Sequence, residues 1–327
     1  MPTDWFLNCC TPFGEVPPQK EQSLNIPTIS RRLTALSIGV LLTALFIPSA
    51  KADDISATLG AAGPSNYAIL FLSTSGQPQM NGPGTTNGNV GYNGNTTLQL
   101  NGSSGPEING NLILGNSASV NTPGQVTGAI LTGQGATLNA AQAAALNAVT
   151  VFNALTPTLG LTSVNGSLTI TGVAGLNVID LTGINLGNGQ TLDLAGPAGA
   201  EFVINDSGNL VLNSGLIEET GGLLTDDVVF NVAGNVQTSG GLNNESVING
   251  IVLDKSGQIN LAPGEINGEL IAGGNNPQIV SGASVNQIIN NTPEPSTLLL
   301  LSMGLGGFLL FANAVGRFPF ANHLLKS

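Results

Sequence analysis

A short hydrophobic and polar pattern recurs along the middle of the chain. It consists of Ile or Val, then Asn or Thr, then Gly, then any residue, then an aliphatic residue. Copies of this pattern begin at Ile108, Val126, Val164, Ile248 and Ile266. The first two copies begin 18 residues apart, and so do the last two. A turn followed by a short strand, repeated at about this period, predicts the stacked coils of a β-solenoid.

The segments beside these turns have the period-two pattern of strands. Residues 168–171 and 258–261 alternate aliphatic with polar residues, and residues 228–232 also fit a short strand. Such alternation is typical of strands whose aliphatic side chains point inward. Gly and Asn suit the tight corners, because they tolerate positive φ. The pattern therefore predicts a mainly β fold, a parallel β-helix, with a β-sandwich as the alternative.

One segment breaks the strand pattern and predicts a single helix. Residues 137–155 contain no Gly or Pro and are rich in Ala, which favours helix. Six apolar residues fall on one face at helical spacing: Leu138, Ala141, Ala145, Val149, Phe152 and Leu155. Thr137 or Asn139 can cap the start, and Pro157 stops the helix. We expect one helix at about 138–155 that lies along the solenoid wall and buries this face.

The chain has an apolar segment near each end. At the N-terminal side, Arg31 and Arg32 precede an apolar run from Leu33 to Ile47, and small residues follow at Ala50 and Ala52. This order predicts a secretory signal peptide that is cleaved after Ala52. The alternatives are a short membrane anchor and a buried helix, although a run of this length is short for a membrane span.

At the C-terminal side, Pro293, Glu294, Pro295 and Ser296 precede an uncharged stretch over residues 298–315, and Arg317 follows it. A helix of that length can just cross a bilayer. The positive-inside rule then places the last residues in the cytoplasm and the Pro-Glu-Pro on the outer face. We therefore expect hydrophobic helices near both termini.

The C-terminal segment resembles the PEP-CTERM sorting signal. The resemblance rests on Pro293, Glu294, Pro295 and Ser296, the apolar residues after them, and Arg317. It implies processing by an exosortase during export from a Gram-negative bacterium that makes extracellular polysaccharide. The family usually ends in an Arg-rich cluster, whereas a single Arg317 stands here, so a plain C-terminal anchor is the alternative. The expected organisation is a leader and signal peptide (1–52), a β-helical surface domain (53–292), a sorting signal with a transmembrane helix (293–317) and a short tail (318–327).

The middle region also resembles two families of β-helical domains. Early coils, one helix and further coils are similar to the right-handed β-helix of the ice-binding-like family and to choice-of-anchor A adhesin-like domains. Residues 59–62, 66–70 and 279–285 are of that type, and the resemblance covers roughly residues 55–288. It implies a right-handed winding of the coils.

Charge excludes nucleic acid as a partner. Only 8% of the residues are charged, against roughly 25% in a typical soluble domain. Residues 53–292 hold 15 acidic residues and one basic residue, Lys255, for a formal charge of −14. A surface of this sign repels phosphate backbones and anionic lipid head groups.

The expected mature region lacks the side chains of most catalytic sites. Residues 53–292 contain no Cys, His, Trp or Arg, which excludes disulfides and zinc sites there and leaves serine or cysteine triads without a His base. We therefore predict no enzyme activity and no cofactor. A carboxylate pair for glycoside hydrolysis is the alternative, with these candidates: Asp180, Asp193, Asp206, Asp226 and Asp227. The only Tyr rings available for a sugar platform are Tyr67 and Tyr92.

Two ligand alternatives remain open. Asp226 and Asp227 could offer oxygen ligands to calcium, although acidic loops that keep a secreted protein soluble explain them as well. Ice binding needs outward Thr in regular ranks, and Thr169 with Thr171 is the best Thr-x-Thr pair. The sequence predicts a non-enzymatic exported protein of the cell surface or extracellular matrix, with a structural or adhesive role. Extracellular polysaccharide and the cell envelope are its expected partners, and an ice-binding protein on the same scaffold is the alternative function.

Overall fold

The computed structural model describes residues 54–102, 107–241 and 244–288. In this region short parallel strands stack into coils with three faces. The helix face runs in the order β10 (Leu159–Gly160), β12 (Gly175–Leu181), β15 (Ala200–Asp206), β18 (Val228–Val232), β20 (Val247–Asp254), β22 (Glu265–Ala272), β1 (Ile69–Phe71), β4 (Val90–Tyr92), β7 (Leu112–Leu114) and β9 (Ile130–Leu131).

The second face, called the amide face below, is a sheet of eight strands. Its order is β13 (Ile184–Leu186), β16 (Leu210–Asn213), β19 (Val236–Ser239), β21 (Ile259–Leu261), β23 (Gln278–Val280), β2 (Gln79–Asn81), β5 (Thr97–Leu100) and β8 (Ser119–Val120).

The third face, called the acidic face below, contains the first halves of β20 and β22, which bend from this face to the helix face. Its other strands are β11 (Leu168–Thr171), β14 (Thr191–Ala195), β17 (Leu216–Thr220), β24 (Ser284–Asn286), β3 (Thr86–Asn87) and β6 (Ile108–Asn109). The pairings between strands on all three faces are parallel, as a β-helix requires, whereas sandwich sheets are antiparallel. The β-sandwich alternative is therefore wrong, and the winding hand stays a prediction.

The recurring Asn-Gly pattern forms the corners of the coils. Gly250 and Gly268 lie at the bends of β20 and β22, with φ of 127° and 146°. A Cβ on Gly268 would lie 2.1 Å from the carbonyl oxygen of Gly250 in the next coil. Glycine is needed at this corner because the backbone is left-handed there and the coils approach closely.

The predicted helix is present and buries the predicted face. α3 (Gly135–Asn153) packs on the helix face, and Leu138, Ala141, Ala145, Val149 and Phe152 are buried against it. Leu155 lies just past the helix end and is partly buried in the same cluster. The predicted caps are wrong, because the helix begins before Thr137 and Asn139 and no side chain caps Gln134 at its start.

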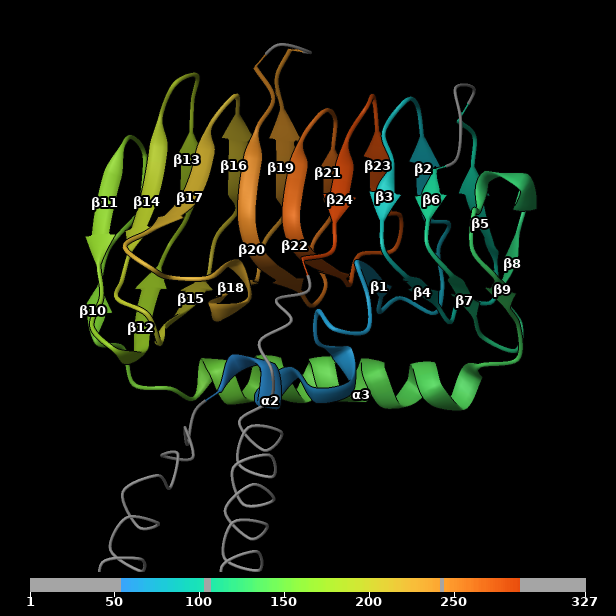
Figure 1. Cartoon of the computed structure of the whole chain (residues 1–327), viewed down its shortest axis with the longest axis horizontal. Coiled ribbons are helices and arrows are strands. Elements are labelled where there is room, and N and C mark those ends of the chain that lie inside the picture. The colour runs from blue at the N-terminus through green and yellow to red at the C-terminus, as the bar shows by residue number, and fades with distance from the viewer. Residues whose placement is uncertain (1–53, 103–106, 242–243, 289–327) are drawn as a thin grey trace, which may run out of the picture. The chain divides into compact units, whose positions relative to one another are not determined.

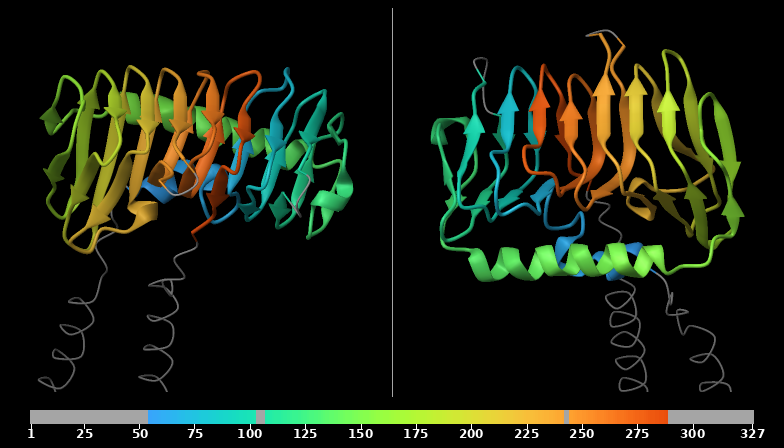
Figure 2. Two further views of the ribbon diagram at one scale, coloured as in Figure 1. Left: turned by 90° about the horizontal axis from the view of Figure 1, so that it is seen from above. Right: turned by 180° about the vertical axis from the view of Figure 1, so that it is seen from behind.

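The order of the coils along the stack differs from their order along the chain. The first coils form one end of the stack, and α3 then carries the chain along the helix face to the opposite end (Figure 1). The later coils return along the stack until β22 pairs with β1, β23 with β2, and β24 with β3. We call this contact between the first and last coils the join; both views in Figure 2 show it where the last strands meet the first ones. The sequence analysis did not predict the join.

In the described part of the chain, four short helical segments lie outside the strands of the stack. α2 (Ile55–Leu59) and η1 (Gly60–Ala62) pack against α3, and the Asp54 side chain accepts a hydrogen bond of 2.8 Å from the backbone N–H of Ser56 at the start of α2. The other two are η2 (Pro123–Gln125), beside β9, and η3 (Thr225–Asp227), before β18.

The core has two parts. Inward side chains from all three faces fill the coil interior, and a second cluster lies between the helix face and α3 with α2.

Both predicted export segments lie outside the described residues. These are the signal peptide with Ala50 and Ala52, and the C-terminal segment with Pro293, Glu294, Pro295, Ser296 and Arg317. Within residues 54–288, apart from the two short gaps, no helix is long and apolar enough to cross a membrane.

Candidate functional site

The amide face presents a row of side-chain amides at one register position. Strand pairing aligns Asn185, Val211, Gln237, Asn260, Gln278, Gln79 and Gln99 from one end of the sheet to the other, and Val211 is the one residue among them without an amide. Their neighbours on each strand are mostly buried aliphatic residues, so these side chains point outward. At the β8 end, the Asn121 side chain donates a hydrogen bond of 3.2 Å to Gln99 Oε1. We call these residues, with Asn121, the amide row.

Charged residues are absent from the strands of the amide face. None of its eight strands contains Asp, Glu, Lys or Arg. The acidic face carries Asp193, Glu218, Glu219 and Glu265 in its strands, and the helix face carries further acids. The net negative charge of the domain is therefore placed away from the amide face, which can approach a neutral partner without desolvating an ion.

The predicted Thr pair lies on the acidic face at the end of the stack. Thr169 and Thr171 are exposed on β11. In register, Asp193 and Glu218 follow Thr169, while Ala195 and Thr220 follow Thr171. The Thr220 hydroxyl donates a hydrogen bond of 2.7 Å to Asp193 Oδ1. The two threonines thus start no continuous threonine rank, since Asp193 follows Thr169 and Ala195 follows Thr171.

A ladder of asparagine side chains crosses the join on the acidic face. Asn249, Asn267, Asn286, Asn87 and Asn109 stand at one register position, each amide bonded to the next over 2.7–3.1 Å. Thr127 extends the ladder with a bond of 3.0 Å to Asn109 Oδ1. The recurring Asn of the sequence pattern therefore holds consecutive coils together, and Asn286 also donates a hydrogen bond to Glu265 Oε1.

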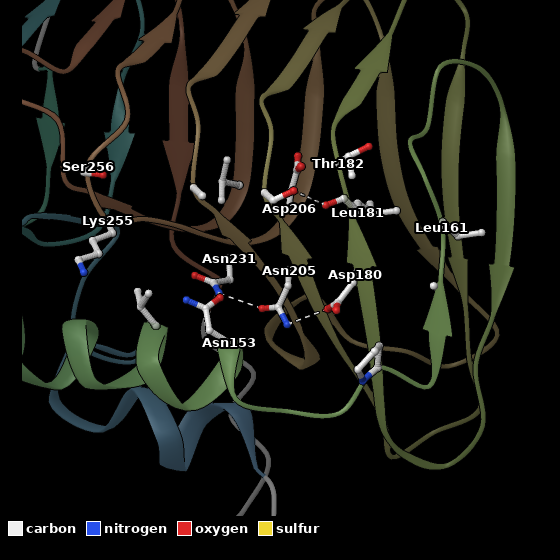
Figure 3. Close-up of a pocket in the computed structure, with 16 residues that line it drawn as sticks. Asn153, Leu161, Asp180, Leu181, Thr182, Asn205, Asp206, Asn231, Lys255 and Ser256 are labelled. Atoms are coloured by element: carbon white, nitrogen blue, oxygen red, sulfur yellow. Dashed lines mark hydrogen bonds between the residues drawn. The ribbon is translucent and has the colours of Figure 1, made fainter.

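A hollow of about 550 Å³ lies where the C-terminal end of α3 meets the helix face (Figure 3). Asn205 Nδ2 donates hydrogen bonds to the Phe152 carbonyl (3.0 Å) and to Asp180 Oδ1 (3.2 Å). Asn231 Nδ2 donates to Asn205 Oδ1 and to Asn153 Oδ1. Lys255, the only basic residue of the expected mature region, lines the same hollow. In the close-up the Lys255 ammonium group points away from Asp180. The hydrogen bonds of Asn205 and Asn231 to Phe152 and Asn153 attach the end of the helix to the strands.

Two of the carboxylates considered for hydrolysis, Asp180 and Asp206, line this hollow, and the other three lie elsewhere. Asp180 is on the helix face and Asp193 on the acidic face, while Asp206 is buried at the end of β15. Asp226 and Asp227 belong to η3. In the part of the chain that the structure describes, no group of three or more His, Cys, Asp or Glu side chains could hold a metal ion.

Several acids are instead buried in the wall of the stack, which the sequence analysis missed. Burial raises the pKa of Glu219 and of Glu107 to about 7, and that of Asp254 to about 6. Burial also raises the pKa of Asp206, and raises that of Glu269 well above its usual value. Glu269 is fully buried, and burial together with this carboxyl group raises the pKa of the Tyr67 phenol. Asp254 accepts hydrogen bonds from the backbone N–H groups of Ser256 and Gly257, and Asp206 accepts one from that of Gly208.

The missed features were partly visible in the sequence. The amide row follows from the inward and outward alternation of each strand once the register is known, but the alignment of Gln278 with Gln79 depends on the join. Glu219 could have been identified because it follows Ile217 by two residues in a strand and so shares its inward side.

Comparison with known proteins identifies the C-terminal motif. The PEP-CTERM protein-sorting motif matches residues 291–314, which include Pro293, Glu294, Pro295 and Ser296 and end before Arg317. This match confirms the predicted sorting motif. No curated protein matches the chain.

Solved structures similar to this chain are ice-binding proteins. The protein from an Arctic yeast is 20% identical with a TM-score of 0.50, over 74% of this chain and 98% of that chain. The protein from the Antarctic ascomycete Antarctomyces psychrotrophicus is 23% identical with a TM-score of 0.49, over 71% and 98%. The DUF3494 domain of a Shewanella frigidimarina ice-binding protein is 18% identical with a TM-score of 0.49, over 71% and 97%. At these identities the yeast protein shows the β-helical fold alone.

Proposed function

We propose that this chain is an exported, non-enzymatic protein of the bacterial surface or matrix, and that its amide face adheres to neutral extracellular polysaccharide. The coil stack presents this face as a rigid surface. The carboxylates serve to keep the domain soluble and to discourage contact with acidic polymers.

The observation that supports adhesion is the uncharged amide row. Consecutive positions of the row stand one coil apart, about 4.8 Å, along the whole sheet, and Val211 is the one position without an amide. A side-chain amide both donates and accepts hydrogen bonds, as sugar hydroxyls do, so a row of amides can follow a polyhydroxylated chain. No ion has to lose its hydration when such a partner binds.

The sorting motif supports the location. The PEP-CTERM motif implies export and processing by an exosortase-type enzyme at the membrane. With a signal peptide cleaved after Ala52, the coil stack would reach the outside of the inner membrane and then the surface or matrix of a Gram-negative cell. A membrane helix over residues 298–315, followed by Arg317, would tether the precursor.

Ice binding is the second candidate. It is favoured by the regular spacing and the absence of charge on the amide face, and by the ice-binding names of the structures with this fold. Thr169 and Thr171 would not carry it, because Asp193 and Glu218 interrupt their rank. An ice-binding surface would therefore have to be the amide face.

The test adds charge to the amide face of residues 53–292. The variant Gln79→Glu/Gln237→Glu/Gln278→Glu places three acids in the amide row. We expect it to lose binding to insoluble neutral glucan or chitin by tenfold or more in a pull-down assay, because three ions must then be desolvated. The control Ala140→Glu/Ala143→Glu/Asn147→Glu adds the same charge on the exposed side of α3 and should bind like the parent.

Two outcomes would contradict the proposal. Equal loss of binding in both variants would show that net charge, and not the amide face, governs adhesion. Thermal hysteresis by the parent at micromolar concentration, without polysaccharide binding, would instead establish the ice-binding alternative.

A further inference from the structure

Within residues 54–102, 107–241 and 244–288 the coil stack has an unpaired strand edge at each end, and neither end coil contains a charged residue. β9 pairs only with β7 and β8 only with β5, while at the opposite end β10 pairs only with β12 and β11 only with β14. No Asp, Glu, Lys or Arg occurs between Glu107 and Asp180, the segment that forms both end coils and α3. Proteins usually protect open strand edges with charges, and solenoids usually end in polar capping coils. Among the described residues, neither end has an ionic cap of its own.

Aliphatic side chains reach both ends on all three faces. On the helix face, strand pairing aligns one inward-pointing residue of each strand in a row. This row runs from Leu159 at one end to Ile130 at the other. The corresponding row of the acidic face runs from Leu168 to Val126. Val164 and Val120 hold the equivalent end positions on the amide face.

Five of these six end residues are partly open to solvent, whereas Val164 is buried. Leu159 and Leu168 are 42% and 37% exposed, and Val120, Val126 and Ile130 are half-buried. Four of the seven exposed large hydrophobic residues of the described region are in or next to the end strands: Leu131, Leu159, Leu168 and Val173.

The join shows that such an end can accept a coil from another segment. At the join β1, β2 and β3 pair in register with β22, β23 and β24, although about 200 residues separate the paired positions. The contact uses parallel pairing on all three faces and apolar contacts inside, with no chain connection between the two coils. The same contact can form between two molecules if their end coils have the same three-faced shape and their inward-pointing residues stand opposite one another.

We propose that copies of this chain stack head to tail, with the β8–β9 end of one copy on the β10–β11 end of the next. Ile130 of one copy then lies opposite Leu159 of the next, Val126 opposite Leu168, and Val120 opposite Val164. The described residues next to both terminal segments lie away from these ends, because α2 packs on α3, and β24 pairs with β22 and β3. The contact joins two different surfaces and does not close on itself, so it produces open filaments. It does not depend on what the amide face binds.

Disulfide trapping tests this contact in the full-length chain, purified in mild detergent with Cys9→Ser and Cys10→Ser. The double variant Ile130→Cys/Leu159→Cys places one cysteine at each end. Paired positions of neighbouring parallel strands are about 5 Å apart, within the range that a disulfide spans. Because Ile130 and Leu159 are at opposite ends of the stack, a link between them joins two molecules. We expect a ladder of linked species on a non-reducing gel after mild oxidation.

The controls separate this contact from random collision and from contact between like ends. Each single cysteine variant should give no linked species, and dimers from either would show that like ends meet and would overturn the head-to-tail arrangement. Leu224→Cys/Ile130→Cys should give no ladder, although Leu224 is as exposed as Leu159 at 42% and lies outside the end coils.

A second cysteine pair and a sedimentation experiment keep the proposal testable if the first variant does not fold. If the Ile130 substitution unfolds the protein, Leu131→Cys/Gly160→Cys occupies the adjacent register pair and replaces it. A folded double variant, judged by circular dichroism, that forms no ladder overturns the proposal. In sedimentation experiments the parent should form assemblies that grow with concentration, Leu159→Lys should remove them, and Leu224→Lys should leave them unchanged.

Discussion

At the scale of single residues, the stack places carboxylic acids where its coils otherwise carry aliphatic side chains. Glu219 stands in register with Leu194, an inward residue of the neighbouring coil, and its Oε1 atom is buried without a hydrogen-bond partner. Burial favours the neutral acid and raises the pKa of Glu219 to about 7, although a hydrogen bond from the Asn249 side chain lowers it. The native state therefore binds this proton more tightly than the unfolded chain does.

This difference makes stability depend on pH. The native protein holds more protons than the unfolded chain between the usual pKa of 4.5 and about 7, so the free energy of unfolding falls as pH rises through that window and stays lower above it. Glu219→Gln cannot ionise. We expect it to raise the free energy of unfolding at pH 8 by roughly 1–2 kcal/mol, a value reduced for partial solvent screening, and to change little at pH 4. Urea unfolding at the two pH values measures this.

The neighbouring acid supplies the control for this prediction. Glu218→Gln changes the net charge by the same amount on the outward side of β17, and its stability should be nearly the same as that of the parent at both pH values. An equal gain in both variants would assign the effect to the net charge. A loss of stability in Glu219→Gln at pH 8 would contradict the buried-acid explanation.

At the scale of elements, side-chain amides fasten α3 to the coils. Asn205 bonds to the Phe152 carbonyl in the last turn, to Asp180 and to Asn231, so one residue links the helix end with three strands. The last carbonyls of a helix lack partners within the helix, and a side-chain donor can satisfy them. The apolar face of α3 supplies the area of contact, and these amides fix its C-terminal end.

Removal of this amide should loosen the helix end. Asn205→Ala leaves the Asn231 amide and the Asp180 carboxylate each without one partner, and we expect a loss of about 1–3 kcal/mol in the free energy of unfolding. Hydrogen exchange should become faster in the last turns of α3 before it does elsewhere. Asn213→Ala, at an exposed position on β16, should change stability by less than about 0.5 kcal/mol. Uniform exchange along α3 would show that the amides do not hold its end.

The elements also show what the sequence could predict. The apolar side of α3 was predictable because its residues recur with a helical period of 3.6. The Asn-Gly corners were predictable because tight turns restrict the choice of residue. The helix cap was not predictable, because the chain entering from β9 starts the helix before the candidate Thr137 and Asn139. The neighbours of Thr169 depend on which strands pair, which local patterns do not encode. For the same reason the alignment of the amide row could not be predicted from the sequence.

At the scale of the whole molecule, the fold is closed by a contact between its first and last coils. Residues near position 70 pair with residues near position 270, so both parts must be present before this contact forms. The pairing of Ile69 with Leu270 and of Met80 with Ile279 extends the apolar interior through the join. Contacts of such high sequence separation are slow to form and depend on the coils on either side.

Gly84 offers a direct test of the join. A Cβ at this position would lie 1.8 Å from the carbonyl oxygen of Ala283, which is backbone of the adjoining coil and cannot move alone. We expect Gly84→Ala to lower the free energy of unfolding by about 1–3 kcal/mol, because the extra methyl group pushes the two coils apart. Hydrogen exchange should increase most in β2, β3, β23 and β24 and least in β15 and β18, which pair with each other far from the join. Gly124→Ala, where a Cβ meets no atom within 4 Å, should be nearly neutral. If exchange in Gly84→Ala increases equally in all coils, the stack unfolds as one unit and the join is no weaker than any other step between coils.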